Sequence, residues 1–204
     1  MSDLVQIGEQ ILGCKEPHYP FPNKPRGIYV ETNELVAGLL DGTVSRSNYS
    51  ETIDSLMRDH DIQIVLSIEE NPAPDARYVV RGFFELQQYW AREHRNSKHY
   101  RPIRETIGER FGKKDLLLIH AESVFCEGKV SSNDVSYCAA HHLVRIVDWL
   151  YKQRGDEFRV VLVGKRAYDT LYLFRNKGVE VYTTPHPAAR RFGIKMALKR
   201  LLPP

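Results

Sequence analysis

The residue best suited to chemistry is His186, a lone imidazole held between Pro185 and Pro187 after the β-branched run 179–183. Such a run indicates a buried strand. Because the prolines fix φ and cannot continue a ladder, His186 is expected on a stiff loop just beyond that strand. α/β proteins bind their ligands at the carboxyl edge of the sheet, so His186 is the first candidate for catalysis. The alternative is a structural histidine that caps the strand end.

A second junction of the same kind follows the apolar run 62–68, which leads into the polar turn 69–75. Two more strands are expected at 116–119 and 160–163. Asn133 or Asp134 is a suitable cap for the longest helix. The predicted helices cover 1–13, 31–40, 49–59, 83–93, 102–111, 133–151 and 165–175. Strands that alternate with helices predict a three-layer α/β/α sandwich with a central, mainly parallel four-stranded sheet.

The composition indicates one globular domain, since the chain has 204 residues of which 42% are hydrophobic. We expect residues 1–60 to form a helical and loop N-terminal extension and residues 61–204 to form the core that carries the motifs. The longest apolar runs are too short to span a membrane, and the N-terminus lacks the pattern of a signal peptide. Cys14, Cys126 and Cys138 form no disulfide or metal-ligand pattern. We therefore expect an intracellular, cytoplasmic monomer whose cysteines are small buried or partly buried residues.

The C-terminal segment concentrates positive charge, although the net charge of the chain is only +3. On a helix, Arg191, Lys195 and Lys199 would share one face at i, i+4 spacing, with Arg190 beside them. Such a face could bind the phosphates of DNA. The alternative is an ordinary solvated face.

Three stretches, in order, resemble the uracil-DNA glycosylase superfamily, and they cover about residues 60–204. Residues 64–74, with Asn71, are similar to the strand and Gly-x-Asn-Pro-Gly turn of the single-strand-selective and thymine/mismatch branches. Residues 161–167 resemble the family's late strand, glycine and helix start. Residues 186–190 are similar to its His-Pro-Ser-Pro-Arg loop. In addition, Phe83 and Phe84 follow Asn71 at about the distance of the family's base-stacking aromatic.

The resemblance implies a monofunctional DNA glycosylase that flips out a deaminated or modified base, hydrolyses its N-glycosidic bond and leaves an abasic site, as in base excision repair. Asn71 would position the attacking water, and His186 would donate to a carbonyl of the departing base. The extruded base would stack on Phe84, or next on Phe83, for which core packing is the alternative. The residues assigned to DNA binding are Arg190, which would wedge into the duplex, Arg191, Lys195 and Lys165.

Several positions depart from the family pattern: Glu69 and Ala73 replace glycines, and Ala188 replaces the phosphate-binding serine. No asparagine follows strand 116–119, where the family reads the base, so His120 or Glu122 must serve instead. These side chains offer other donors and acceptors, which could change the target base. The alternative for His120 is an ordinary residue at a strand end. Glu69, Glu70 and Asp75 could include a general base or be exposed turn acids. The four-cysteine pattern of the iron–sulfur branches is missing, so we expect no cluster, no other metal and no cofactor.

Two other functions stay open. The same fold could serve as a catalytically inactive DNA- or nucleotide-binding module whose altered motifs record lost activity. A hydrolase could use Cys126 or Cys138 with His141 or His142, although no nucleophile turn surrounds either cysteine.

Overall fold

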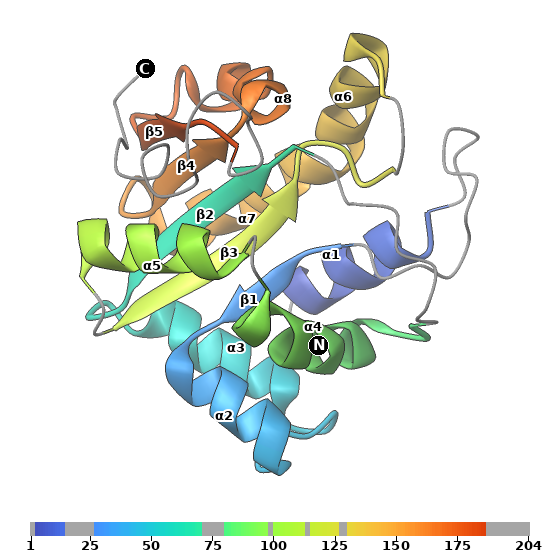
Figure 1. The fold of residues 1–204 in the computed structure, drawn as a ribbon, viewed down its shortest axis with the longest axis vertical. Coiled ribbons are helices and arrows are strands. Elements are labelled where there is room, and N and C mark those ends of the chain that lie inside the picture. The colour runs from blue at the N-terminus through green and yellow to red at the C-terminus, as the bar shows by residue number, and fades with distance from the viewer. Residues whose placement is uncertain are drawn as a thin grey trace.

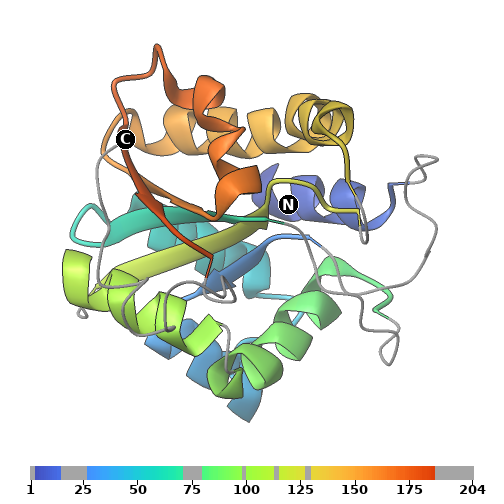
Figure 2. The ribbon, with the colours of Figure 1, turned by 45° about the horizontal axis from the view of Figure 1, so that its top comes forward.

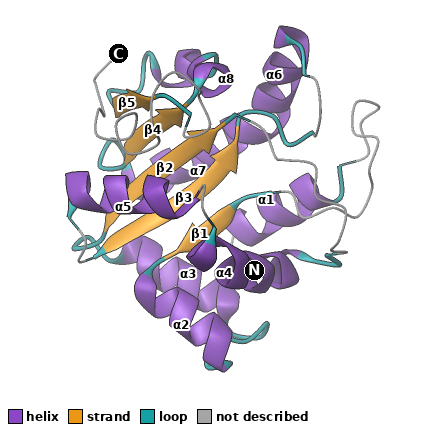
Figure 3. Cartoon of the chain, viewed as in Figure 1, coloured by secondary structure: helices purple, strands orange, loops and turns teal. Residues whose placement is uncertain are grey.

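The computed structural model describes residues 3–14, 27–70, 80–97, 100–112, 115–126 and 130–186. They form a mixed α/β structure around a central sheet, with helices on both of its faces (Figures 1 and 3). The strands are β1 (Tyr29–Glu31), β2 (Gln63–Glu69), β3 (Leu116–Glu122), β4 (Arg159–Val163) and β5 (Glu180–Thr184). The helices are α1 (Asp3–Leu12), α2 (Asn33–Asp41), α3 (Tyr49–Arg58), α4 (Phe83–Asn96), α5 (Tyr100–Phe111), α6 (Ser132–Cys138), α7 (Val144–Arg154) and α8 (Lys165–Tyr168).

The sheet has five strands, in the order β1-β3-β2-β4-β5. The four longer strands are parallel and match the predicted ones, whereas β1 pairs antiparallel with β3. The prediction of a four-stranded sheet was therefore wrong, because it lacked this edge strand. It was missed because β1 has only three residues and leads directly into α2. The Thr32 side chain accepts from the Leu35 N–H at 2.9 Å, so the helix begins at Asn33 and leaves Glu31 in the strand.

Alternation along the strands separates the two faces of the sheet. In β2, Ile64, Leu66 and Ile68 belong to the larger core, which they share with α1, α3 and α7. Val65 points to the other face, where it packs with Ile103 and Ile107 of α5. Figure 1 shows α5 in front of the sheet and α7 behind it, and Figure 2 shows the same layers after rotation.

Two predicted helices differ in detail. The helix expected at 133–151 begins one residue earlier, at Ser132, because Ser131 caps it through a capping box with Asp134. A π-helical turn, Ala139–Leu143, interrupts it between α6 and α7. The helix expected at 165–175 is the short α8 followed by a 3₁₀ turn, Leu171–Phe174.

The part of the chain that the structure describes contains no helix long and apolar enough to cross a membrane. None of the three cysteines is in a disulfide bond. Cys126 and Cys138 are buried together in a small apolar cluster that includes residues of α6. This packing agrees with the expected role of the cysteines as small buried residues.

Candidate functional site

The carboxyl ends of the four parallel strands lie along one edge of the sheet, and each of them carries a residue singled out in the sequence. Glu69 ends β2 in register with Glu122 at the end of β3. Lys165 follows β4 by two residues, and His186 follows β5 by two residues. Because Val163 pairs with Thr184, the ends of β4 and β5 are also level. Parallel pairing therefore gathers the candidate residues from four separate strands on one edge.

The chain leaves β2 toward β3 and later returns to place β4 on the other side of β2, so β2 and β4 flank the switch point of the sheet. Here the Glu70 carboxylate accepts from the Lys165 N–H at 3.0 Å. The Ser123 hydroxyl donates to the Glu70 carbonyl. Gly164, between β4 and α8, has φ 90°, and a Cβ at this position would lie 2.4 Å from Glu70 Oε1. The turn that precedes Asn71 is thus held against the start of α8.

The assigned catalytic and DNA-binding residues fall partly within the described structure. His186 is partly buried, and Lys165 is exposed as the first residue of α8. Asn71, Arg190, Arg191 and Lys195 lie outside the described residues, as do Asp75 and Ala188.

The two candidate stacking residues begin α4 on the opposite side of the sheet from α5. Phe83 is fully buried in the larger core, and its ring makes an edge contact with Tyr49 at 6.0 Å. A Cβ at Gly8 would lie 2.3 Å from the Phe83 ring, so α1 packs directly on it. Phe84 is partly buried and also contacts Tyr49, with ring centroids 5.7 Å apart. Phe83 thus occupies the position of a core residue, whereas Phe84 keeps part of its surface accessible.

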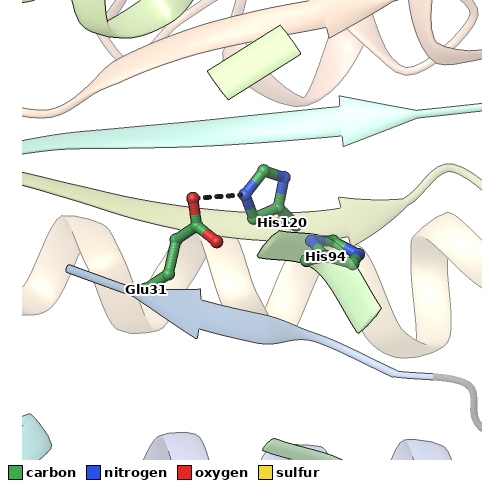
Figure 4. A group of neighbouring side chains, drawn as sticks. All are labelled: Glu31, His94 and His120. Atoms are coloured by element: carbon green, nitrogen blue, oxygen red, sulfur yellow. Dashed lines mark ion pairs between the residues drawn. The ribbon is translucent and has the colours of Figure 1, made fainter. Parts of the chain in front are cut away.

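His120 lies inside the protein, on the face of β3 that α5 covers. Its Nδ1 is 3.3 Å from Glu69 Oε1, and its Nε2 is 3.7 Å from Glu31 Oε1. All three residues are buried, with 3–5% of their surface exposed. Figure 4 shows Glu31 reaching from β1 toward His120, and His94 from α4 beside them. We call Glu31, Glu69, His94, His120 and Glu122 the polar cluster.

The opposite charges of His120 and Glu31 stabilise the charged form of each side chain. Burial by itself would lower the pKa of His120, but hydrogen bonding and the charges of Glu31 and Glu69 outweigh it and raise the pKa to about 9. For Glu31, burial would raise the pKa, yet His120 and the nearby Arg104, at 3.8 Å, hold it below its usual range. At neutral pH, His120 is therefore an imidazolium between two carboxylates.

Glu122 and His94 are shifted toward their neutral forms. Burial, and then the negative charge of Glu69, raise the pKa of Glu122 well above its usual value. Burial, and then the positive charges of His120 and Arg104, keep the pKa of His94 well below its usual value. The neutral form of Glu122 is a protonated carboxyl that offers one donor and one acceptor, and the neutral form of His94 is an uncharged imidazole.

Aromatic rings enclose the polar cluster. The His94 ring stacks on Tyr100 of α5 at 3.6 Å and makes an edge contact with Trp90 at 4.4 Å. Tyr29 of β1 lies parallel to His120 at 5.8 Å. These rings cover part of the polar cluster, and the low local dielectric strengthens the electrostatic interactions within it.

The sequence pointed to His120 and Glu122 but not to Glu31 and His94. Glu31 belongs to the missed strand, and one histidine in a polar helix carries no pattern of its own. The hydrophobic segment Ile28–Val30 that ends in a glutamate was the only available signal. Glu69 is not an exposed turn acid, because it is buried against His120, and Glu70 is bound to the start of α8.

The polar cluster includes the one group of three or more potential metal ligands found among the described residues: Glu31, His94 and His120. In the cysteine–histidine pairs of the alternative hydrolase, His142 is buried. Cys126 and Cys138 are 3% exposed, and His141 points outward and stacks on Tyr137.

No family model matches the chain, and a search of the curated proteins finds no significant relative.

Proposed function

We propose that the protein is a monofunctional DNA glycosylase, which hydrolyses the N-glycosidic bond of an extruded deaminated or modified base and leaves an abasic site. The observation that supports this most is the gathering of the candidate residues at the carboxyl edge of four parallel strands. The turn before Asn71 leaves β2, and His186 follows β5, with only β4 between them. Two strand spacings correspond to about 10 Å, which suits a sugar with its base between the two side chains.

The two side chains would act on opposite ends of the breaking bond. The base departs with developing negative charge, while the sugar becomes cationic and water attacks its free face. His186, as a neutral donor to a carbonyl of the base, would stabilise the transition state by about 3 kcal/mol. Asn71 would orient the water through its amide oxygen. Because Glu69 and Glu70 already have partners, this role falls to Asn71 rather than to either carboxylate.

The polar cluster would supply base recognition. A protonated Glu122 presents a donor beside an acceptor, which is the pattern that an amide side chain offers. It therefore suits a base edge with one donor next to one acceptor, as in uracil or hypoxanthine. His120 is less suited to direct contact, because its ring already lies between Glu31 and Glu69.

The test is abasic-site formation on oligonucleotides that each contain one uracil, hypoxanthine or modified cytosine, as single strands and duplexes. Release of at least one base supports the proposal. DNA binding without release of any base would instead support the inactive binding module. His141→Ala serves as a control, since His141 is exposed and lies away from the polar cluster.

A further inference from the structure

We propose that Glu31, His94 and His120 form a binding site for one divalent transition-metal ion of the zinc type. The three side chains come from β1, α4 and β3, and their potential ligand atoms all lie within 4.8 Å of one another. All three residues are buried. The site does not depend on the glycosylase activity proposed above, because it rests on this geometry alone.

Several buried polar atoms of these residues lack a hydrogen-bond partner. Both oxygens of Glu31, His94 Nδ1, His120 Nε2 and the Tyr29 hydroxyl are buried without a hydrogen-bond partner. The ion pair from His120 Nε2 to Glu31, at 3.7 Å, is longer than a hydrogen bond. Buried polar groups are normally satisfied, so a concentration of unsatisfied ones at one place points to a missing ligand. A single cation between the three side chains would satisfy the carboxylate and both imidazoles together.

The donor set fits a borderline metal. Two imidazole nitrogens with one carboxylate oxygen form the three-ligand set of many zinc sites, with a fourth position left for water. Calcium and magnesium prefer sites made of oxygen atoms, which argues against them here. In a tetrahedral site, ligand bonds of about 2.1 Å place two ligands about 3.4 Å apart. The ligand atoms now lie within 4.8 Å of one another, so closing the set needs side-chain movements of up to about 1 Å.

The surroundings match those of a metal-bound histidine. With Nε2 bound to the metal, the Nδ1–H of His120 would donate to Glu69, which lies 3.3 Å away. This carboxylate–histidine–metal arrangement orients the ring and increases its basicity. Metal binding would displace the His120 proton, since a ligating imidazole is neutral. Glu31 and Glu69 then supply two negative charges, against one positive charge from Arg104, which lies 3.8 Å from Glu31.

An entry route lies beside Glu31. A cleft of about 530 Å³ between α2 and α5 is lined by Glu31 and Arg104, with Thr32, Asn33, Gly108 and Leu118 around them. Arg104 is the side chain at the cleft wall that would have to move as an ion passes.

The test is titration of the tag-free, chelator-treated protein with Zn²⁺ by calorimetry, and with Co²⁺ by visible absorption. We expect one ion per chain and a Co²⁺ spectrum with nitrogen ligation. His94→Ala and the nearly isosteric Glu31→Gln should each weaken Zn²⁺ binding at least tenfold. Glu69→Gln should weaken it by about 10- to 100-fold through the orientation of His120. His141→Ala, an exposed histidine outside the set, should bind as the wild type does.

Circular dichroism and thermal unfolding establish that each variant is folded. Glu31→Gln preserves the size of the side chain, so it still tests the site if His94→Ala does not fold. The proposal is overturned if the wild type does not bind Zn²⁺ at one ion per chain. Water would then be the partner of the polar atoms between Glu31, His94 and His120. The proposal is also overturned if Glu31→Gln binds as tightly as the wild type, or if His141→Ala is the variant that loses the ion.

Discussion

The buried imidazolium of His120 predicts that the metal-free protein loses stability as the pH rises above 6.5. His120 has a pKa of about 9 in the folded protein, against 6.5 as the ordinary value. A group whose pKa is raised by folding contributes its full stabilisation below the unfolded pKa and loses it as the pH rises through the folded pKa. The window is therefore pH 6.5 to 9, and the difference corresponds to roughly 3 kcal/mol.

Urea unfolding of chelator-treated wild type and His120→Gln, at half-unit steps from pH 6 to 9.5, measures this contribution. The difference in unfolding free energy between the two proteins should shrink by about 3 kcal/mol across the window. Glu122, whose pKa is also raised, lowers the stability of both proteins as the pH rises, so the comparison with the variant is needed. Below pH 6.5 the reverse holds for His94, whose pKa is lowered: its contribution is lost as the pH falls. A constant difference between wild type and variant over pH 6.5–9 would refute the imidazolium between two carboxylates.

Three other substitutions test the edge of the sheet. Gly164→Ala should destabilise the protein by about 2 kcal/mol or more and slow base release, because its Cβ would meet Glu70. Gly42→Ala is the control, since Gly42 also has a positive φ but has open space around it. It should cost only about 1–2 kcal/mol of stability and leave the rate of base release unchanged. Glu122→Gln should keep base release within a few fold, since it reproduces the neutral donor and acceptor, whereas a rate loss of 100-fold or more would mean that an ionised Glu122 is needed. Arg190→Ala should slow release from duplex more than from single-stranded DNA in the same assay, and equal slowing would argue against a wedge.

Periodicity predicted much of the fold, because long β-branched runs and amphipathic helices each bury one face. It placed the four parallel strands and the helix on each side of them. It failed at β1, where three residues are too few to show a period, and at α8, where the 3₁₀ turn breaks the helix. Pairing with β3, which no local pattern reveals, determines β1.

The candidate site could be predicted where a residue ends a strand, and not where burial alone gives it a role. His186 and Glu122 could be inferred from strand ends, since parallel strands finish at a common edge. His120 was expected near that edge, but its two carboxylate partners could not be known without the register of β1 and β2 on β3. His94 reaches the polar cluster only because α4 packs against β1 and α5, and that contact has no signature in sequence.

Single-turnover base release by the wild type, Asn71→Ala, His186→Ala and the control His141→Ala tests the central claim most directly. The account predicts that each of the first two substitutions slows release from the best substrate about 100-fold or more, while DNA affinity stays within a few fold. The control should match the wild type. Wild-type rates in both Asn71→Ala and His186→Ala would contradict the assignment of catalysis to these two strand ends.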